Sequence, residues 1–445
     1  MSSGKTLYDH FIVKTLTLKV RNKEKELVDA NKPVFLCKDL TKFIAQVMTE
    51  RDLEICTIKI GIDSGGGSFK ICLNLLEARF GITDMNVALE HEKLCREKSF
   101  LNSPSSKRSK NSSGQYKSKK SSNFRQLFII GICKGLSELY ENFKIFFDEL
   151  GLRKLQYYLA ADFQAINIPL GLQGFSAKYC CPYCIKARPY CRKTKAEKRT
   201  LGRIRKLSHE FREKLSSGEA LWKDAMKYEN CINEPLFDHG DETFILDLIP
   251  IPELHLFLGI TNKILSLLND KWSQLTGVQD RAYKWCDENY IHLLEYGGKD
   301  LNGPSCKQLL DKKLEKLKED LPECLHDFVL VFEAFDVVRH SCFSEELIPS
   351  YKTDISHFGD LYCNLKTFED KAVEIIPKIH ILLDHVPDFC ESNNCALAFF
   401  NEQASEHVHK DFLQIWKNYK ILSEDHPKYD SQFLSAGLEY NQRHL

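Results

Sequence analysis

Apolar and polar residues alternate at residues 58–62, the first clear secondary-structure pattern in the chain. Three isoleucines alternate there with Lys59 and Gly61, which predicts a half-buried β-strand. Three glycines closely follow Asp63 and predict a tight turn into a second β-rich run at residues 69–76. Asp63 thus ends a strand beside a flexible turn, where a carboxylate either holds a cation or simply caps the turn.

Two further apolar runs flank an amphipathic helix. The short, continuously apolar run at residues 126–132 predicts a buried strand, and the helical spacing of apolar residues at 136–150 predicts a helix. Residues 156–161 predict another strand, which ends on Asp162. Strands alternating with a helix favour an α/β sheet. Asp162 either holds Mg²⁺ jointly with Asp63 or is an ordinary loop residue held by backbone N–H groups.

Helical periodicity dominates the C-terminal half. We expect one or two helices in residues 1–50, helices through most of residues 248–389, and a clear helix at residues 401–420. On this last helix Glu406 lies on a face beside the apolar stripe. Glu406 either completes a metal site begun by the strand-end aspartates or forms a routine i,i+4 ion pair with Lys410.

The composition is that of an intracellular globular protein without overall charge. A length of 445 residues suggests about two to four domains. Lys+Arg and Asp+Glu both number 62, so any attraction to nucleic acid must be local. The 17 cysteines are irregularly spaced, which favours reduced thiols over a disulfide framework. The sequence shows no secretory signal pattern, and no apolar run approaches the roughly 18 residues that span a membrane.

Two segments are strongly basic. Residues 101–125 are rich in Ser, Asn and Lys and predict a disordered linker or surface loop, with a nuclear localisation signal or a phosphate-contacting arm as alternatives. Residues 186–206 hold ten Lys or Arg and one acid, Glu197. Such a run is either a solvated face or a salt-sensitive DNA contact. The residues expected at DNA are Arg192, Lys193, Lys195, Lys198, Arg199, Arg203, Arg205 and Lys206.

Cys181 and Cys184 form a C-x-x-C pair after a glycine-containing loop. In a reduced compartment this motif is either a redox pair or half of a zinc site, and its setting favours a zinc knuckle. His380 and His385, far downstream, are five apart, which does not place both on one helix face. Pro387 predicts that the helix ends near there and that His385 is presented from a turn. Spacing alone favours two unrelated histidines near a helix end over a shared site.

With these segments in order, the chain resembles the Transib transposases and the related recombination-activating recombinase of vertebrate immunity, over about residues 58–419. The zinc site of those enzymes pairs a C-x-x-C with a distant H-x-x-x-x-H-V-P. Both halves are matched here, by Cys181-Pro-Tyr-Cys184 and by His380-Ile-Leu-Leu-Asp-His385-Val-Pro. The resemblance therefore implies one zinc ion held by these four residues.

The catalytic residues of the family are matched in part. Its catalytic glutamate lies in a helix with the pattern Glu-x-x-Asn-Lys, and Glu406-His-Val-His-Lys410 fits with His409 in place of Asn. Asp63 falls where the first catalytic aspartate is expected.

The sequence differs from the family at the position of the second catalytic aspartate. The family carries it just after the strand that matches residues 126–132, where this sequence has Cys133 and Lys134. Asp162, one strand later, either takes over this role or the metal site is broken. No domain for recognising transposon ends is evident before residue 50, which indicates a fragment or a domesticated, inactive descendant.

The resemblance implies an α/β plus α fold, with an RNase H-like core and a zinc-binding, mainly helical insertion. The expected parts are an N-terminal helical segment at 1–50, the first part of the core at 51–170, the insertion at 171–390 and C-terminal helices completing the core at 391–445.

The resemblance also implies the function. We expect a transposase-derived, nuclear, DNA-binding protein with structural Zn²⁺, acting on DNA with a second copy of the chain and without a membrane or a small-molecule cofactor. If it is an enzyme, Asp63, Asp162 and Glu406 hold Mg²⁺ or Mn²⁺ for strand cleavage and transfer. The alternative is an inactive, zinc-dependent interaction module.

A glycine-rich motif offers a rival function. Residues 61–67 resemble the first phosphate loop of the sugar-kinase and actin superfamily. A short glycine motif is a weak indication, and no second phosphate loop or adenosine-binding glycine pair follows it.

Overall fold

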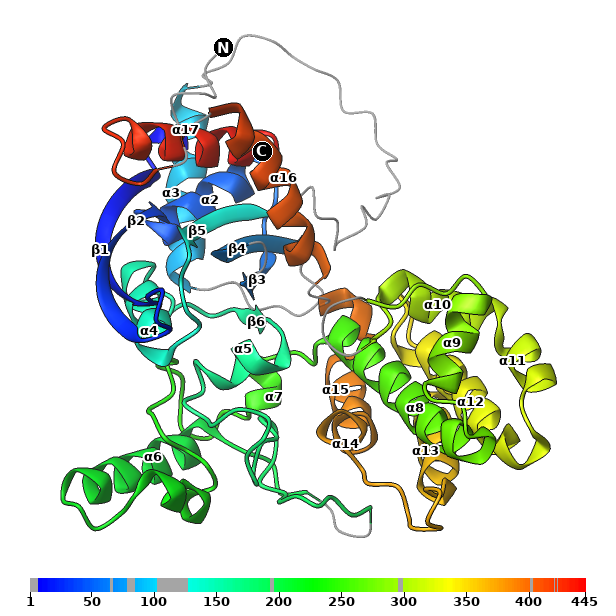
Figure 1. Cartoon of the computed structure of the whole chain (residues 1–445). Coiled ribbons are helices and arrows are strands. Elements are labelled where there is room, and N and C mark those ends of the chain that lie inside the picture. The colour runs from blue at the N-terminus through cyan, green and yellow to red at the C-terminus, as the bar shows by residue number, and fades with distance from the viewer. Residues whose placement is uncertain are drawn as a thin grey trace. The chain divides into compact units, whose positions relative to one another are not determined.

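The computed structural model describes residues 7–64, 67–77, 85–101, 127–192, 196–294, 299–400, 403–419, 421 and 423–445, with side chains except at 77, 96–101 and 403–407. The chain forms two compact units (Figure 1). The first comprises Met1–Gly174, Thr200–Ile249 and Glu402–Leu445, and the second comprises Phe175–Arg199 and Pro250–Asn401. The predicted linker at 101–125 lies almost entirely outside the described residues.

The first unit contains a mixed sheet, with the described strands in the order β1-β2-β5-β4-β3-β6. All neighbours are antiparallel except β3 and β6, which are parallel. The strands are β1 (Phe11–Arg21), β2 (Leu27–Cys37), β3 (Cys56–Asp63), β4 (Ser68–Glu77), β5 (Phe128–Lys134) and β6 (Tyr158–Ala160). The helices of this unit are α2 (Leu40–Glu50), α3 (Met85–Leu101), α4 (Tyr140–Glu149), α5 (Phe163–Asn167), α6 (Leu201–Ser216), η2 (Trp222–Tyr228), α7 (Ile245–Leu248), α16 (Gln403–Tyr419) and α17 (Tyr429–Gln442).

Strand β3 has two unlike faces, and helices cover both. Its isoleucines pair with apolar residues of β4, and Phe69 of β4 packs against Phe143 and Phe146 of α4. On the other face, Lys59 and Lys70 are each only 1% exposed, and α16 packs against β3. The expectation of a half-buried strand is therefore wrong, because the polar face is covered as well.

The second unit is helical in its described part. Its long helix α8 begins directly after Pro252, where a proline is tolerated, and ends at Gly277 in the left-handed conformation. The helices are α8 (Glu253–Thr276), α9 (Arg281–Glu288), α10 (Gly303–Lys312), α11 (Leu314–Asp320), η3 (Glu323–Leu325), α12 (His326–Cys342), α13 (Tyr351–Asn364), α14 (Pro377–Asp384), α15 (Val386–Asn393) and η4 (Leu397–Phe400). Among the described helices, none is long and apolar enough to cross a lipid bilayer.

Residues 1–50 differ from the helical segment expected there. A β-hairpin, β1 and β2, precedes α2. Leu16, Leu18 and Val20 are buried and alternate with Thr17 and Lys19, a period of two that a strand requires and a helix does not accommodate. The prediction of helices for residues 11–37 is therefore wrong.

The expected boundaries of the insertion also change. Residues 200–249 belong to the sheet unit and not to one continuous insertion at 171–390. A β-bridge joins Leu172 to Cys231, and α7 packs against β6, so this segment returns to the sheet. The segment expected to bind zinc is thus divided along the chain into 175–199 and 250–401.

Candidate metal centre and carboxylate pocket

Four buried side chains of the second unit converge on one point. We call Cys181, Cys184, His380 and His385 the Cys/His cluster. Their ligand atoms all lie within 4.8 Å of one another, and every one of these residues is buried. The Sγ of Cys181 lies 3.4 Å from Nε2 of His385, and the Sγ of Cys184 lies 3.2 Å from Nε2 of His380. These separations suit a tetrahedral ion bound at about 2.3 Å by sulfur and about 2.0 Å by nitrogen.

Local structure presents each ligand. His380 lies within α14, and His385 stands at the junction where α14 ends and α15 begins, with Pro387 in the first turn of α15. The break between the helices lets two histidines five residues apart face the same point. On the cysteine side, the buried Arg199 donates from its guanidinium to the carbonyl of Cys184 at 3.2 Å, and its backbone N–H bonds to the carbonyl of Tyr183.

The protonation of the cluster favours metal binding. The hydrogen bond from Cys181 holds the pKa of the Cys184 thiol far below its usual value, and the imidazoles of His380 and His385 add to this effect. Burial and the neighbouring Cys184 raise the pKa of Cys181. A thiolate is the form in which cysteine binds a metal, and an ion bound here would replace the proton shared by Cys181 and Cys184.

A second layer of side chains orients the imidazole of His380. Its Nδ1 lies 3.0 Å from Oδ2 of Asp384, and Lys186 donates to the same carboxylate oxygen at 2.9 Å. Burial lowers the pKa of His380, but the bonds to Asp384 and Cys184 outweigh burial and raise it. The ring of Tyr190 stacks on His380 with centroids 4.1 Å apart. A carboxylate behind a histidine ligand fixes which nitrogen faces the ion.

This geometry can hold a metal in a closed site. Four protein donors leave no open position for a substrate, which is typical of structural sites. Both cysteines are fully buried and lie against imidazoles, whereas a redox C-x-x-C pair needs access for a partner thiol. The neighbouring Cys180 is not part of the cluster; its Sγ lies 3.2 Å from the hydroxyl of Tyr190.

The predicted catalytic aspartates line one pocket of the first unit. Asp63 ends β3, and Asp162 follows the parallel neighbour β6, so both lie at the same edge of the sheet. They border a pocket of about 480 Å³ together with Glu138 and Arg21. We call this the carboxylate pocket.

Glu138 was not expected at this site. Burial raises the pKa of Glu138, and the charges of Asp162 and Asp63 raise it further. Carboxylates that hinder each other's ionisation are common at cation sites. Only its position, four residues after β5, pointed to it in the sequence, and loop residues are not placed by periodicity.

Both aspartates already have partners within the protein. Asp162 caps α5, and its Oδ1 accepts from the backbone N–H of Ala165 at 2.6 Å, which is the ordinary loop role considered above. Oδ2 of Asp63 contacts Nε2 of His409 on α16. Glu406 also belongs to α16, but its side chain lies outside the described residues.

The last two residues of β5, where the aspartate of the family was expected, do not replace it. Cys133 is buried, and burial raises the pKa of its thiol to about 12. Lys134 places its ammonium 3.9 Å from the ring centroid of Trp416. Strand β4 separates β5 from β3, so Asp162 on the neighbouring side of β3 is the described aspartate that shares a pocket with Asp63.

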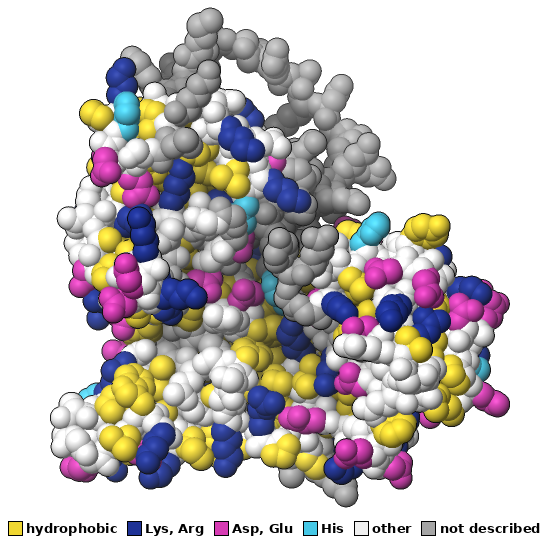
Figure 2. Space-filling view, viewed as in Figure 1, with side chains coloured by type: hydrophobic (Ala, Val, Ile, Leu, Met, Phe, Trp, Pro, Cys, Tyr) yellow, Lys and Arg dark blue, Asp and Glu magenta, His cyan; other side chains and the backbone are white. Residues whose placement is uncertain are grey.

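The basic run between 186 and 206 is mostly used within the fold. The arginines at 192, 203 and 205 pair with Asp360, Glu229 and Asp241, and Lys198 pairs with Asp388. The buried Arg199 holds the cysteine loop. Lys206 is exposed on α6, and Lys193 and Lys195 lie outside the described residues. Lys and Arg are interspersed with Asp and Glu over the face in Figure 2, as the zero net charge leads one to expect.

In comparisons with known proteins, no family model matches this chain, and no curated protein matches it significantly.

Proposed function

We propose that this chain is a transposase-derived DNA-binding protein in which Zn²⁺ stabilises the helical unit and an RNase H-like core carries a carboxylate site. The observation that carries the proposal is the Cys/His cluster. A C-x-x-C and an H-x-x-x-x-H-V-P that are nearly two hundred residues apart meet around one point, as the resemblance to the recombinase family requires.

The sheet supports the assignment of the core. Strands β3, β4 and β5 are consecutive antiparallel neighbours, and β6 returns after α4 to lie parallel beside β3. This is the arrangement expected of an RNase H-like core, with the hairpin β1–β2 added at the edge strand β5. In an active enzyme, Asp63, Asp162 and Glu406 would hold the Mg²⁺ or Mn²⁺ that activates the attacking oxygen.

A specific observation favours the second candidate, a zinc-dependent interaction module without catalysis. Asp162 is engaged in capping α5, and Asp63 is engaged by His409. The expected nuclear location and second copy of the chain belong to the recombinase proposal and remain predictions.

Metal analysis tests the zinc assignment. We expect one Zn²⁺ per purified chain and its loss in a Cys181→Ser variant. Cys180→Ser is the matched control, because Cys180 adjoins the ligand but contacts Tyr190 instead. Protein that folds without any stoichiometric metal would remove the assignment.

Salt dependence tests DNA binding. We expect the affinity for duplex DNA to fall steeply with salt, and Lys206→Gln to weaken it and reduce the slope of log K against log salt by about 0.9. Lys371→Gln is the control, an exposed lysine of the second unit that pairs with Glu369. Binding that is insensitive to salt would exclude phosphate contacts as its source.

A further inference from the structure

Asp63 lies between two basic side chains that come from different elements. The antiparallel register of β3 and β4 sets Lys70 directly opposite Asp63. Helix α16 packs against β3 and brings Nε2 of His409 into contact with Oδ2 of Asp63. The carboxylate at the end of β3 is therefore approached from the neighbouring strand and from the covering helix.

Both basic groups are buried. Lys70 is 1% exposed and His409 is 7% exposed, and the Nζ of Lys70 has no hydrogen-bond partner among the described residues. Burial lowers the pKa of Lys70 to about 8, while the charge of Asp63 opposes this decrease. An ammonium group that is buried without hydrogen bonds is costly, and a nearby carboxylate reduces that cost.

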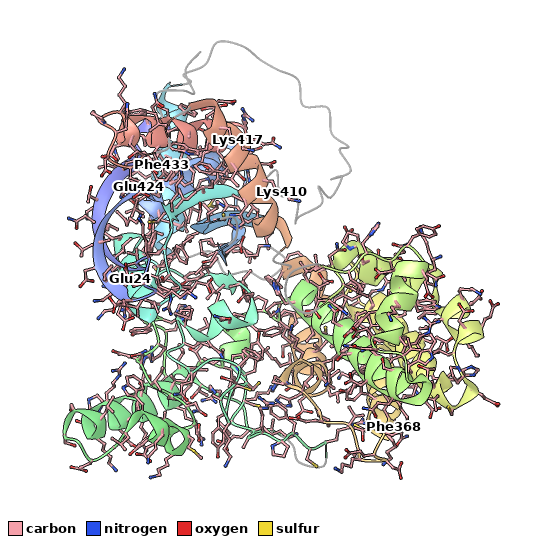
Figure 3. All side chains as sticks on the ribbon, in the orientation of Figure 1. Glu24, Phe368, Lys410, Lys417, Glu424 and Phe433 are labelled. Carbon is pink, nitrogen blue, oxygen red and sulfur yellow. The ribbon has the colours of Figure 1, made fainter. Side chains whose placement is uncertain are left out.

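The next residue on the helix points away from the sheet. Lys410 is exposed and projects outward from α16 (Figure 3), whereas His409 faces the sheet. The helix thus turns an imidazole toward Asp63 at the position where the recombinase pattern has asparagine.

This arrangement differs from the Cys/His cluster in one essential respect. In the cluster, four donors of lone pairs face one another, and an ion between them satisfies all four. At Asp63 the oxygen already faces an imidazole nitrogen, and Lys70 adds positive charge nearby. A divalent cation that binds this Oδ2 oxygen has to displace the imidazole, and it meets repulsion from the ammonium group of Lys70.

We propose that His409, supported by Lys70, acts as an internal substitute for a divalent cation at Asp63, so that the carboxylate pocket binds Mg²⁺ or Mn²⁺ only weakly. The inference rests on the carboxylate site of the proposed function and deepens it. It describes a recombinase site that is held closed to its metal by the chain's own side chains.

A titration with Mn²⁺, followed by electron paramagnetic resonance on the full-length, zinc-loaded chain, tests this proposal. We expect His409→Asn to tighten Mn²⁺ binding about tenfold or more, because the amide reaches less far and leaves the Asp63 oxygen open. Lys70→Met, which removes the charge and keeps the volume, should tighten binding by a smaller factor. Lys410→Gln is the matched control and should bind as the wild type does.

A double variant locates the gained site. Asp63→Asn in the His409→Asn background should remove the whole gain in affinity. Equal binding by wild type and both single variants overturns the proposal. Weaker binding by His409→Asn overturns it too, since the imidazole would then be a ligand of the ion.

Two further measurements keep this result separate from the rest of the proposed function. Zinc content and thermal unfolding show whether each variant is folded, and DNA binding is measured without divalent cations. Absence of DNA binding would contradict the DNA-binding proposal and leave the Mn²⁺ result standing. Unchanged Mn²⁺ binding in folded variants that bind DNA would contradict only the inference about His409.

Discussion

The Cys/His cluster and the carboxylate pocket both gather side chains that bind metals, but they use their donors differently. In the cluster, all four ligand atoms face one another, and the surrounding residues orient them. In the pocket, Asp162 caps a helix and Asp63 contacts His409. The comparison teaches that metal-binding residue types close together do not by themselves make a metal site. Their donor atoms must also be free of bonds to other protein groups, so that the ion can accept their lone pairs.

The largest effect is expected when the cluster loses a ligand. Cys184→Ser or His380→Ala should abolish stoichiometric zinc and unfold the second unit, since binding energy at a structural zinc site is folding energy. Metal analysis combined with circular dichroism checks this, and a chelator applied to the wild type should have the same effect. Asp63→Asn, the corresponding change in the carboxylate pocket, should leave the zinc content unchanged.

A smaller loss of zinc binding is expected when a residue that orients a ligand is changed. Asp384→Asn should lower zinc affinity by about 10- to 100-fold, because the carboxylate fixes the orientation of His380. Competition with a chromophoric chelator measures the change. Asp388→Asn is the control, as Asp388 pairs with Lys198; an equal loss in both variants would indicate a general effect of charge.

In the carboxylate pocket, the role of Asp162 as a helix cap can be separated from the effect of its charge. Asp162→Ala should destabilise the first unit by about 1 kcal/mol through loss of the helix cap, whereas Asp162→Asn keeps a good cap and should cost much less. Denaturant unfolding measures both. If the two variants are equally stable, capping is not the role of Asp162.

The smallest effect is expected at the outer edge of the cluster. Tyr190→Phe keeps the ring stacked on His380 and removes only the contact between the hydroxyl and Cys180. We expect a loss of stability of about 1 kcal/mol or less and unchanged zinc content. Thermal unfolding and metal analysis check this, and a loss of zinc would show that the hydroxyl orients the ligands.

Sequence patterns predicted where strands and helices lie better than they predicted which of their faces are buried. The strand that ends on Asp63 and the mixed α/β character are confirmed, since periodicity reports which residues lie on one face. The burial of Lys59 was missed, because the cover over that face comes from α16, hundreds of residues later. The hairpin of β1 and β2 was missed although Leu16 to Val20 alternate with polar residues.

Neither the cysteine pair nor the histidine pair predicts the candidate metal site by itself. Spacing alone did not relate His380 to His385, because a helix end between them decides where each side chain points. Only the resemblance to the recombinase family related the cysteine pair to the two histidines. The described geometry brings the four side chains within reach of one ion. The sequence singled out His409 only as the residue in place of the asparagine of the family. The contact of His409 with Asp63 and the place of Glu138 in the carboxylate pocket follow from tertiary packing.

The long interval between the two halves of the Cys/His cluster has a consequence during synthesis. His380 follows Cys184 by 196 positions. At the pace of a ribosome, about 5–20 residues per second, the cysteine loop waits roughly 10 to 40 s for its imidazole partners. Throughout that interval the nascent chain carries an incomplete ligand set, so the four side chains of the cluster can meet only after His385 has been synthesised.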